Sequence, residues 1–158
     1  MIRSLIEMSP KEVAAYFQEL SQPAFRASQV LQWVWKKSAT DFSQMTNLPA
    51  TLRSELAESM TVFTSSIAAE SLSSDSLVKL ALAMADGEVI ETVMIPSSSR
   101  RTACVSTQCG CGMGCVFCAS GLDGLRRNLT PGEIVEQILM LQHFTGERIT
   151  NVVFMGMG

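Results

Sequence analysis

The sequence predicts an α+β protein that continues into a parallel α/β unit. Three observations lead to this prediction. Helical periodicity dominates residues 1–60, and strand-like alternation with turn signals dominates residues 61–99. Residues 100–158 then follow the order strand, loop, helix, strand, which opens parallel α/β folds. We therefore expect a helical accessory domain, an antiparallel linking segment and the beginning of an α/β domain.

Three helices are expected in the first 60 residues. The first begins at Ser9-Pro-Lys-Glu12, which supplies an N-cap serine, a proline at the first helical position and a glutamate three residues after the cap. The second covers 24–37 and ends in two lysines, and the third follows Pro49. The expected inward-facing residues are Val13, Ala14, Phe17, Leu20, Val30, Leu31, Val34, Trp35, Leu52, Leu56 and Ala57.

Strands are expected between residues 62 and 108. The segments 65–74, 75–96 and 101–108 alternate or are rich in β-branched residues, and Asp86-Gly87 within the second segment is a hairpin turn signal. Serine-rich turns at 71–76 and 97–99 separate the neighbouring segments. The pattern predicts three or four antiparallel strands.

The last third of the chain predicts a βαβ unit. A second capping box at 129–133 opens a helix through Gln142, and the expected buried residues of this helix are Ile134, Ile138, Leu139 and Leu141. A buried strand over 149–155 follows. Because one βαβ unit leaves a sheet edge unpaired and a face uncovered, we expect the chain to be part of a longer protein.

The composition narrows the class of protein. Hydrophobic residues make up 47% of the chain and charged residues 17%, which favours a globular fold over disorder. Neither a signal peptide nor an apolar run of about 18 residues is apparent, so we expect a cytoplasmic protein without a membrane partner. The net charge of −3 does not indicate nucleic acid binding, and the basic pairs at 36–37, 100–101 and 126–127 are typical of solvated surface.

All five cysteines lie between positions 104 and 118. In a reducing compartment such a cluster indicates metal binding or catalysis. Cys111, Cys115 and Cys118 have the spacing C-x3-C-x2-C in a glycine-rich loop, and three thiolates on a four-iron cluster leave one iron open to a small molecule. The alternative is a structural zinc site in which Cys109 supplies a fourth thiolate.

This motif and its flanks resemble the radical S-adenosylmethionine (SAM) superfamily, and within it the RlmN/Cfr ribosomal RNA methyltransferases. The resemblance also rests on the segments 90–96, 104–108, 127–130 and 150–158 and on the helical N-terminal unit. It implies a partial (β/α) barrel of the TIM type. It further implies a [4Fe-4S] cluster held by the three cysteines of the motif, with SAM bound to the open iron.

The resemblance implies methylation of the C2 carbon of an adenine in 23S ribosomal RNA, with transfer RNA as a further substrate and flavodoxin as an example of the electron donor. In this family one SAM methylates a C-terminal cysteine. A radical made from a second SAM then activates that methyl group for addition to adenine. The methyl-accepting cysteine is absent from the sequence, so we expect this chain alone to be inactive. Methylation of adenine C8 and a non-catalytic zinc- or RNA-binding module stay open as alternatives.

The resemblance also assigns roles to single residues. Cys104 matches the cysteine that helps remove the ring proton and then forms a disulfide with the methyl-carrying sulfur. Glu91 matches the proton acceptor, and the turn Gly156, Met157 and Gly158 matches the beginning of the SAM-binding segment. Without the resemblance, Cys104 is typical of a small buried residue on a strand and Glu91 of a solvent-facing acid. Cys109 departs from the family pattern.

Other conspicuous residues are interpreted as structural. His143 falls at the end of a helix, where a cation suits the helix dipole. Trp33 and Trp35 point in different directions on their helix, so we expect one in the core and one at the surface. The methionines expected to fill the core are Met60, Met94, Met140 and Met155.

Overall fold

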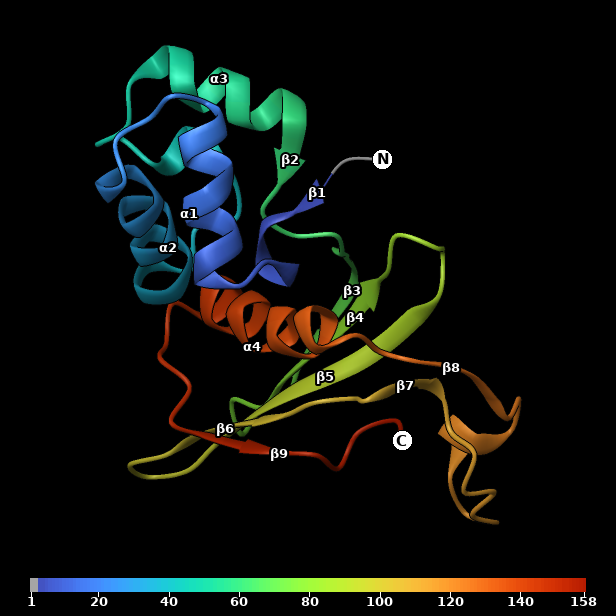
Figure 1. The fold of residues 1–158 in the computed structure, drawn as a ribbon. Helices are drawn as coiled ribbons and strands as arrows, with labels where there is room; N and C mark the ends of the chain where they lie inside the picture. The colour runs from blue at the N-terminus through green and yellow to red at the C-terminus, as the bar shows by residue number, and fades with distance from the viewer. Residues whose placement is uncertain (1–2) are drawn as a thin grey trace. The chain divides into compact units, whose positions relative to one another are not determined.

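The chain forms two compact units, Met1–Thr64 and Ser65–Gly158 (Figure 1). The computed structural model describes residues 3–158. None of the helices in this described range is long and apolar enough to cross a membrane.

The first unit contains the three predicted helices. A two-stranded parallel ladder joins its two ends, because Arg3 pairs with Met60 and Ser4 with Thr61. Two short 3₁₀ helices, Leu5–Glu7 and Phe42–Gln44, connect the longer elements. The longer elements are β1 (Arg3–Ser4), α1 (Pro10–Glu19), α2 (Phe25–Lys37), α3 (Ala50–Ser59) and β2 (Met60–Thr61).

The sequence explains how α1 begins and what the unit buries. The predicted capping box is confirmed, since the Ser9 N–H donates to the Glu12 carboxylate at 2.7 Å and the Glu12 N–H donates to Ser9 Oγ at 3.3 Å. The buried residues of these helices are Val13, Phe17, Ala27, Val30, Val34, Leu52 and Leu56. They recur every three or four residues, as helical periodicity predicts. The buried stripe is narrower than expected, however, since Ala14, Leu20 and Leu31 are only half-buried.

Positions next to this stripe are less buried than expected. Ala57 and Trp35 each follow a buried residue directly, which turns them about 100° around the helix, and both are exposed. Trp33 is half-buried, and its Nε1–H donates to Asn47 Oδ1 at 2.6 Å. The expectation that one tryptophan lies in the core is therefore wrong.

The second unit is built on one five-stranded sheet in the order β3-β4-β5-β6-β9. The first four strands are antiparallel neighbours, as predicted, and β9 pairs in parallel with β6. This sheet contains residues from both 61–99 and 100–158, which the sequence analysis treats as separate segments. The strands are β3 (Ser66–Leu72), β4 (Val78–Ala83), β5 (Val89–Pro96), β6 (Arg101–Cys104) and β9 (Asn151–Val153).

Helix α4 (Pro131–Thr145) lies across one face of the sheet, over β4 and β5 (Figure 1). Its second capping box is confirmed, with Thr130 and Glu133 as partners. Leu139 and Leu141 are buried as expected, but Ile134 and Ile138 are only half-buried. The fully buried positions include the polar residues Glu136 and Gln137 instead.

Hydrogen bonds to the backbone explain why α4 buries polar side chains. Glu136 accepts two hydrogen bonds from Ser65, through its N–H and its hydroxyl, both at 2.6 Å. Gln137 accepts from the Ser106 N–H at 2.8 Å and donates to the Ser106 carbonyl at 2.9 Å. The Gln137 amide thus replaces a neighbouring strand at the point where the chain leaves β6, and it satisfies backbone groups that would otherwise be buried without partners.

Three smaller features complete the unit. A hairpin of β7 (Gln108–Gly110) and β8 (Leu125–Asn128) encloses the cysteine-rich segment, and it was not predicted because its strands are too short to show alternation. Gly87 has φ +86° in the predicted turn between β4 and β5. Met60, Met94 and Met140 are buried, but Met155 is 78% exposed because β9 ends at Val153.

We expect Gln137→Ala to lower the free energy of unfolding by about 2 kcal/mol, because both backbone groups of buried Ser106 lose their partner. Urea unfolding of the chain measures this change. Gln32→Ala, at an exposed position of α2, is the matched control and should stay within about 0.5 kcal/mol of the unaltered chain. Equal effects of the two substitutions would contradict the role given to Gln137.

Candidate functional site

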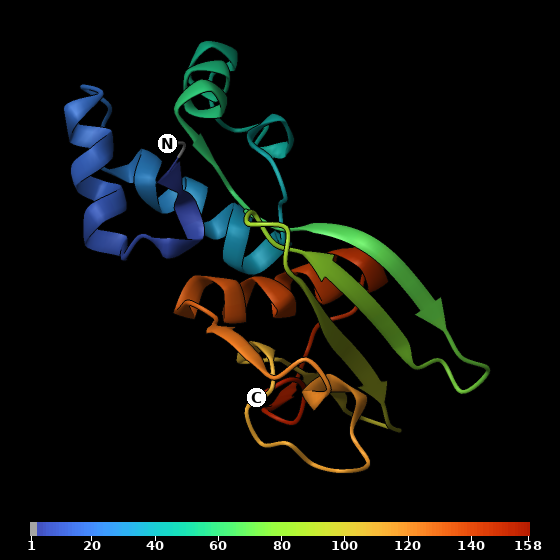
Figure 2. The same cartoon turned by 90° about the vertical axis from the view of Figure 1, so that its right-hand side faces the viewer.

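The residues singled out by the sequence gather at one edge of the five-stranded sheet. Strands β6 and β9 are parallel neighbours, so their carboxyl ends meet at this edge. The cysteine-rich loop leaves the sheet after β6, and the glycine turn at 156–158 leaves it after β9. Figures 1 and 2 place both segments at the same end of the unit. Ligands of open α/β sheets bind at such an edge.

Glu91 and Cys104 lie on the same face of the sheet. Cys104 is paired with Val93 on β5, and Glu91 lies two residues before Val93, so the two side chains are diagonal neighbours at a distance of about 7 Å between Cα atoms. Cys104 is half-buried. Glu91 is half-exposed and forms an ion pair with Lys79 at 2.9 Å. An exposed ion pair is weak, so the Glu91 carboxylate is accessible for chemistry on this face.

The glycine turn packs closely on the chain that follows β6. The Met157 carbonyl accepts from the N–H groups of Thr107 and Gln108, at 2.8 and 3.1 Å. The Met157 N–H donates to Ser106 Oγ at 2.9 Å, and the Ser106 hydroxyl donates to the Glu91 carbonyl at 2.7 Å. A Cβ on Gly156 would lie 2.6 Å from Ser106 Oγ, so this approach requires glycine.

The loop from residue 111 to residue 124 carries the three cysteines of the motif. Cys111 and Cys118 are half-buried and Cys115 is exposed. A turn connects two of them, since the Cys118 N–H donates to the Cys115 carbonyl at 3.1 Å. Gly114 between the first two has φ +63°, a conformation that favours glycine.

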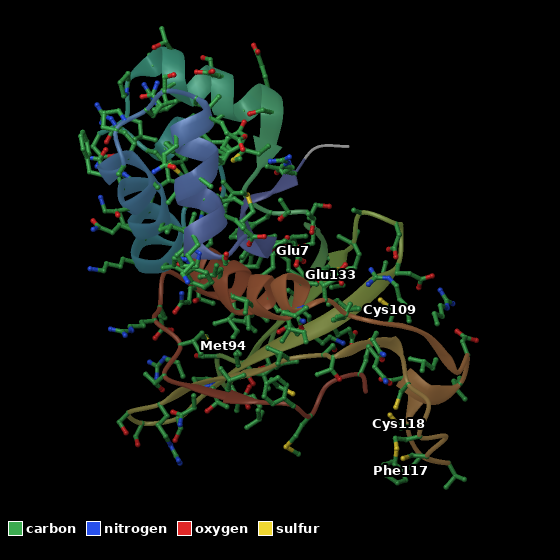
Figure 3. The ribbon with its side chains drawn as sticks, in the orientation of Figure 1. Glu7, Met94, Cys109, Phe117, Cys118 and Glu133 are labelled. Carbon is green, nitrogen blue, oxygen red and sulfur yellow. The ribbon has the colours of Figure 1, made fainter. Side chains whose placement is uncertain are left out.

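The loop fits an iron–sulfur cluster by its donor types. Cysteine thiolates are the ligands of such clusters, and backbone N–H groups donate hydrogen bonds to the cluster sulfurs. Within residues 3–158, however, the structure gathers no set of three cysteine, histidine or acidic side chains into a metal-binding arrangement. The loop also carries exposed apolar side chains, among them Phe117 beside Cys118 (Figure 3).

Cys109 lies apart from Cys118 (Figure 3). It is buried in β7, opposite Arg127 of β8. Burial raises the pKa of the Cys109 thiol, although the charge of Arg127 partly offsets this effect. A buried thiol that resists ionisation is a poor metal ligand.

Known proteins resemble the chain over nearly its whole length. Residues 3–62 match the family model of the ribosomal RNA large subunit methyltransferase N-terminal domain. A protein from Rhodopirellula baltica, named probable dual-specificity RNA methyltransferase RlmN, is 46% identical over 98% of the chain. The chain belongs to the RlmN family. A dual-specificity RNA methyltransferase RlmN from Halorhodospira halophila is 43% identical over 98% of the chain.

The RlmN relatives are longer than this chain. The chain spans 42% of the Rhodopirellula protein and 43% of the Halorhodospira protein. A crystal structure of a radical SAM methyltransferase from Sphaerobacter thermophilus superposes with a TM-score of 0.90 and 37% identity, and the match covers 99% of the chain and 47% of that structure. The fold described above is therefore that of one part of a radical SAM methyltransferase.

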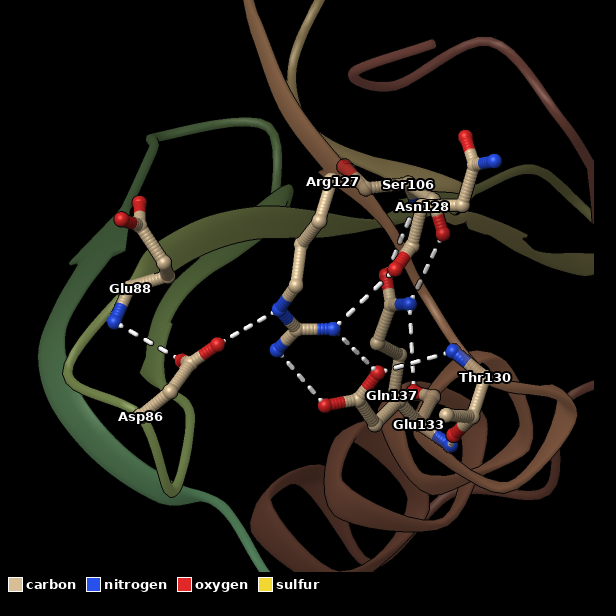
Figure 4. A network of polar contacts seen from close by, with 8 residues as sticks. All are labelled: Asp86, Glu88, Ser106, Arg127, Asn128, Thr130, Glu133 and Gln137. Carbon is tan, nitrogen blue, oxygen red and sulfur yellow. Dashed lines mark hydrogen bonds and ion pairs between the residues drawn. The ribbon is translucent and has the colours of Figure 1, made fainter.

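Beside the cysteine-rich loop, this RlmN-type chain has a charged cluster that sequence analysis missed (Figure 4). Arg127 binds Glu133 through two parallel hydrogen bonds of 2.8 Å and Asp86 through one of 2.5 Å. These three residues are distant in sequence, and the basic pair at 126–127 was interpreted as solvated surface. The partners become evident only when β8 pairs with β7 and lies between the β4–β5 turn and α4.

The cluster shifts the ionisation of its members. Burial opposes the ionisation of Glu133, but hydrogen bonds from Arg127 and from the Thr130 N–H outweigh it, so the pKa of Glu133 lies below its usual value. The hydrogen bond from Arg127 likewise lowers the pKa of Asp86. Hydrogen bonds to Glu133 and Asp86 raise the pKa of Arg127, which stays charged.

We expect Glu133→Gln to lower the free energy of unfolding by about 2 kcal/mol at pH 7, because it removes a charged partner of Arg127. The pKa of Glu133 is lower in the folded than in the unfolded chain. Its stabilising effect is therefore complete above the unfolded value of about 4.3 and is lost as the pH falls through the folded value.

Urea unfolding between pH 7 and pH 3 tests this expectation. The difference between the Glu133→Gln variant and the unaltered chain should narrow as the pH falls below about 4.3. Glu70→Gln, at an exposed position of β3, is the control and should differ by less than about 0.5 kcal/mol at pH 7. A difference for Glu133→Gln that stays constant over this pH range would contradict the role given to the ionised Glu133 carboxylate.

Proposed function

We propose that this chain is the part of a cytoplasmic radical SAM RNA methyltransferase that holds the cofactors, and that the whole protein methylates the C2 carbon of an adenine in 23S ribosomal RNA and also acts on transfer RNA. One observation carries the proposal. The cysteine-rich loop, the glycine turn, Cys104 and Glu91 meet at one edge of the sheet, where β6 and β9 end and β5 begins. The names of the RlmN relatives support it.

In this proposal Cys111, Cys115 and Cys118 hold a [4Fe-4S] cluster, and the turn at 156–158 contributes to SAM binding. When bound, the cluster and SAM supply the carbon-centred radical chemistry that methyl transfer to a base carbon needs. The chain supplies the exposed loop and the backbone N–H groups around it. Further strands after β9 would complete a partial (β/α) barrel, with the site at the carboxyl ends of its strands.

Glu91 and Cys104 are the proposed catalytic residues. Their shared face of the sheet lies next to the glycine turn, since Ser106 bonds to the Glu91 carbonyl and to the Met157 N–H. Glu91 would accept the proton from the adenine ring. Cys104 would assist, and its thiolate would then attack the methyl-carrying sulfur to form a disulfide. The bond between that sulfur and the methylene carbon breaks, and the carbon keeps the electron pair and takes a proton from solvent to become the methyl group on the base. That methyl-carrying cysteine, an electron donor such as flavodoxin and the RNA itself all lie outside this chain.

The burial of Cys109 weighs against the zinc alternative. A four-thiolate zinc site would need Cys109 beside the other three cysteines, whereas it lies in the interior opposite Arg127. The C8 alternative uses the same residues as the C2 reaction, so analysis of the methylated base decides between them.

We expect the chain, reconstituted anaerobically with iron and sulfide, to bind about four iron and four sulfide ions. Each of Cys111→Ala, Cys115→Ala and Cys118→Ala should lose most of the iron. Cys109→Ala is the matched control and should keep it. Zinc without sulfide, or an equal loss in the control, would overturn the three-thiolate site.

We expect Cys104→Ala, placed in a protein of the relatives' full length, to accumulate a covalent link to substrate RNA, because the resolving thiol is absent. Denaturing electrophoresis with labelled RNA detects the link. Cys109→Ala, which removes a buried thiol of the same region, should release its product. Normal release by Cys104→Ala would contradict the resolving role.

A further inference from the structure

We infer that Arg127 is a positioning residue that holds the cysteine-rich loop ready for its cluster by tying the loop's outgoing strand to the β4–β5 turn and to the start of α4. The inference rests on the proposed function, because it assigns a role toward the same cluster. It adds a residue outside the cysteine motif and a turn some 25 positions upstream of that motif.

A hydrogen bond closes the cysteine-rich loop at its base. The Cys111 N–H donates to the Gly124 carbonyl at 3.1 Å, so the first proposed ligand is bonded directly to the end of the loop. Gly110 lies so close that a Cβ there would be 2.0 Å from the Gly124 oxygen. The position of Cys111 therefore depends on where residue 124 and the following strand β8 are held.

Ion pairs of two adjacent arginines hold β8 in place. Two residues after Gly124, Arg126 bonds to Glu88 at 2.7 Å. Arg127 then donates hydrogen bonds to Glu133 from Nη1 and Nη2 and to Asp86 from Nε (Figure 4). Both acidic partners of β8 on the sheet side, Asp86 and Glu88, belong to the turn between β4 and β5. The strand is thus fixed to the sheet and to the helix at adjacent positions.

The ion pair between Arg127 and Glu133 differs from an ordinary surface ion pair. Its side chain is 30% exposed and that of Glu133 only 11%, and bidentate pairs shielded from water are the strong ones. Glu133 also accepts from the Thr130 N–H at 2.8 Å in the capping box of α4. Arg127 is therefore attached to a carboxylate whose own position is already fixed.

Apart from the bond between Cys111 and Gly124, the hydrogen bonds inside the loop are local. The N–H groups of Cys118, Gly121, Leu122 and Gly124 donate to carbonyls three residues earlier in the chain. Such turns shape the loop but do not attach it to the sheet. Attachment comes from the β7–β8 hairpin and its two arginines, so the loss of Arg127 should loosen the loop without unfolding the unit.

Hydrogen exchange of the chain without its cluster tests the inference directly. In Arg127→Gln the hydrogen-bonded amides of the loop should exchange about tenfold faster, because the charged fork is lost. These are the amides of residues 111, 118, 121, 122 and 124. Arg127→Lys keeps the charge without the fork and should lie between. Arg101→Gln is the matched control, since Arg101 is 29% exposed and pairs with Glu147 elsewhere in the same unit. Exchange in the loop should not change in that control.

Iron release to a chelator from the reconstituted chain gives the second readout. Arg127→Gln should release iron about tenfold faster than the unaltered chain, and Arg101→Gln should not. Val78→Ala lowers stability at the end of β4 opposite the β4–β5 turn and shows what instability alone does. Faster release in Val78→Ala equal to that in Arg127→Gln, or unchanged loop exchange in Arg127→Gln, would overturn the inference. If the unaltered chain takes up no cluster while the exchange result holds, the proposed function fails and the anchoring of the loop stands.

Discussion

The hydrogen bonds of Ser106 hold together the parts of the second unit from which the site is built. This residue is fully buried at the point where the chain leaves β6. Its backbone is satisfied by Gln137 of α4, and its hydroxyl joins the Glu91 carbonyl to the Met157 N–H. One small residue thus links the helix through its backbone, and links the strand that carries Glu91 to the glycine turn through its side chain. A buried network of this kind is rigid only when every member has a partner, and here each has one.

The arginine side chains of the second unit also act through partners within that unit. A net charge of −3 gives no sign that basic side chains are important, yet Arg101, Arg126 and Arg127 all bind carboxylates in this unit. Their role is to fasten loops to the sheet, so they are neutralised within the protein. The composition of a small domain therefore says little about where its charges act, because pairing depends on the fold.

The sequence predicted the elements whose causes are local. Both capping boxes, the Asp86-Gly87 turn and the antiparallel strands depend on neighbours in the chain, and all are confirmed.

The wrong predictions have a common origin. Periodicity assumes that apolar residues face the sheet, whereas Gln137 is buried because of its hydrogen bonds to a distant residue. The hairpin of β7 and β8, the partners of Arg127 and the exposure of Met155 depend likewise on tertiary pairing. The spacing of the cysteines was apparent from the sequence, but their neighbours were not.

The parallel pairing of β6 with β9 sets an order of assembly. Strands β3 to β6 pair through short connections, whereas the bond between Arg101 and Thr150 spans 49 residues and forms slowly for that reason. Synthesis also delivers residues 111–118 before residues 156–158. The thiols are therefore available to iron before the glycine turn has a strand to follow. During biosynthesis the segment proposed for the inorganic cofactor precedes the segment proposed for the organic one.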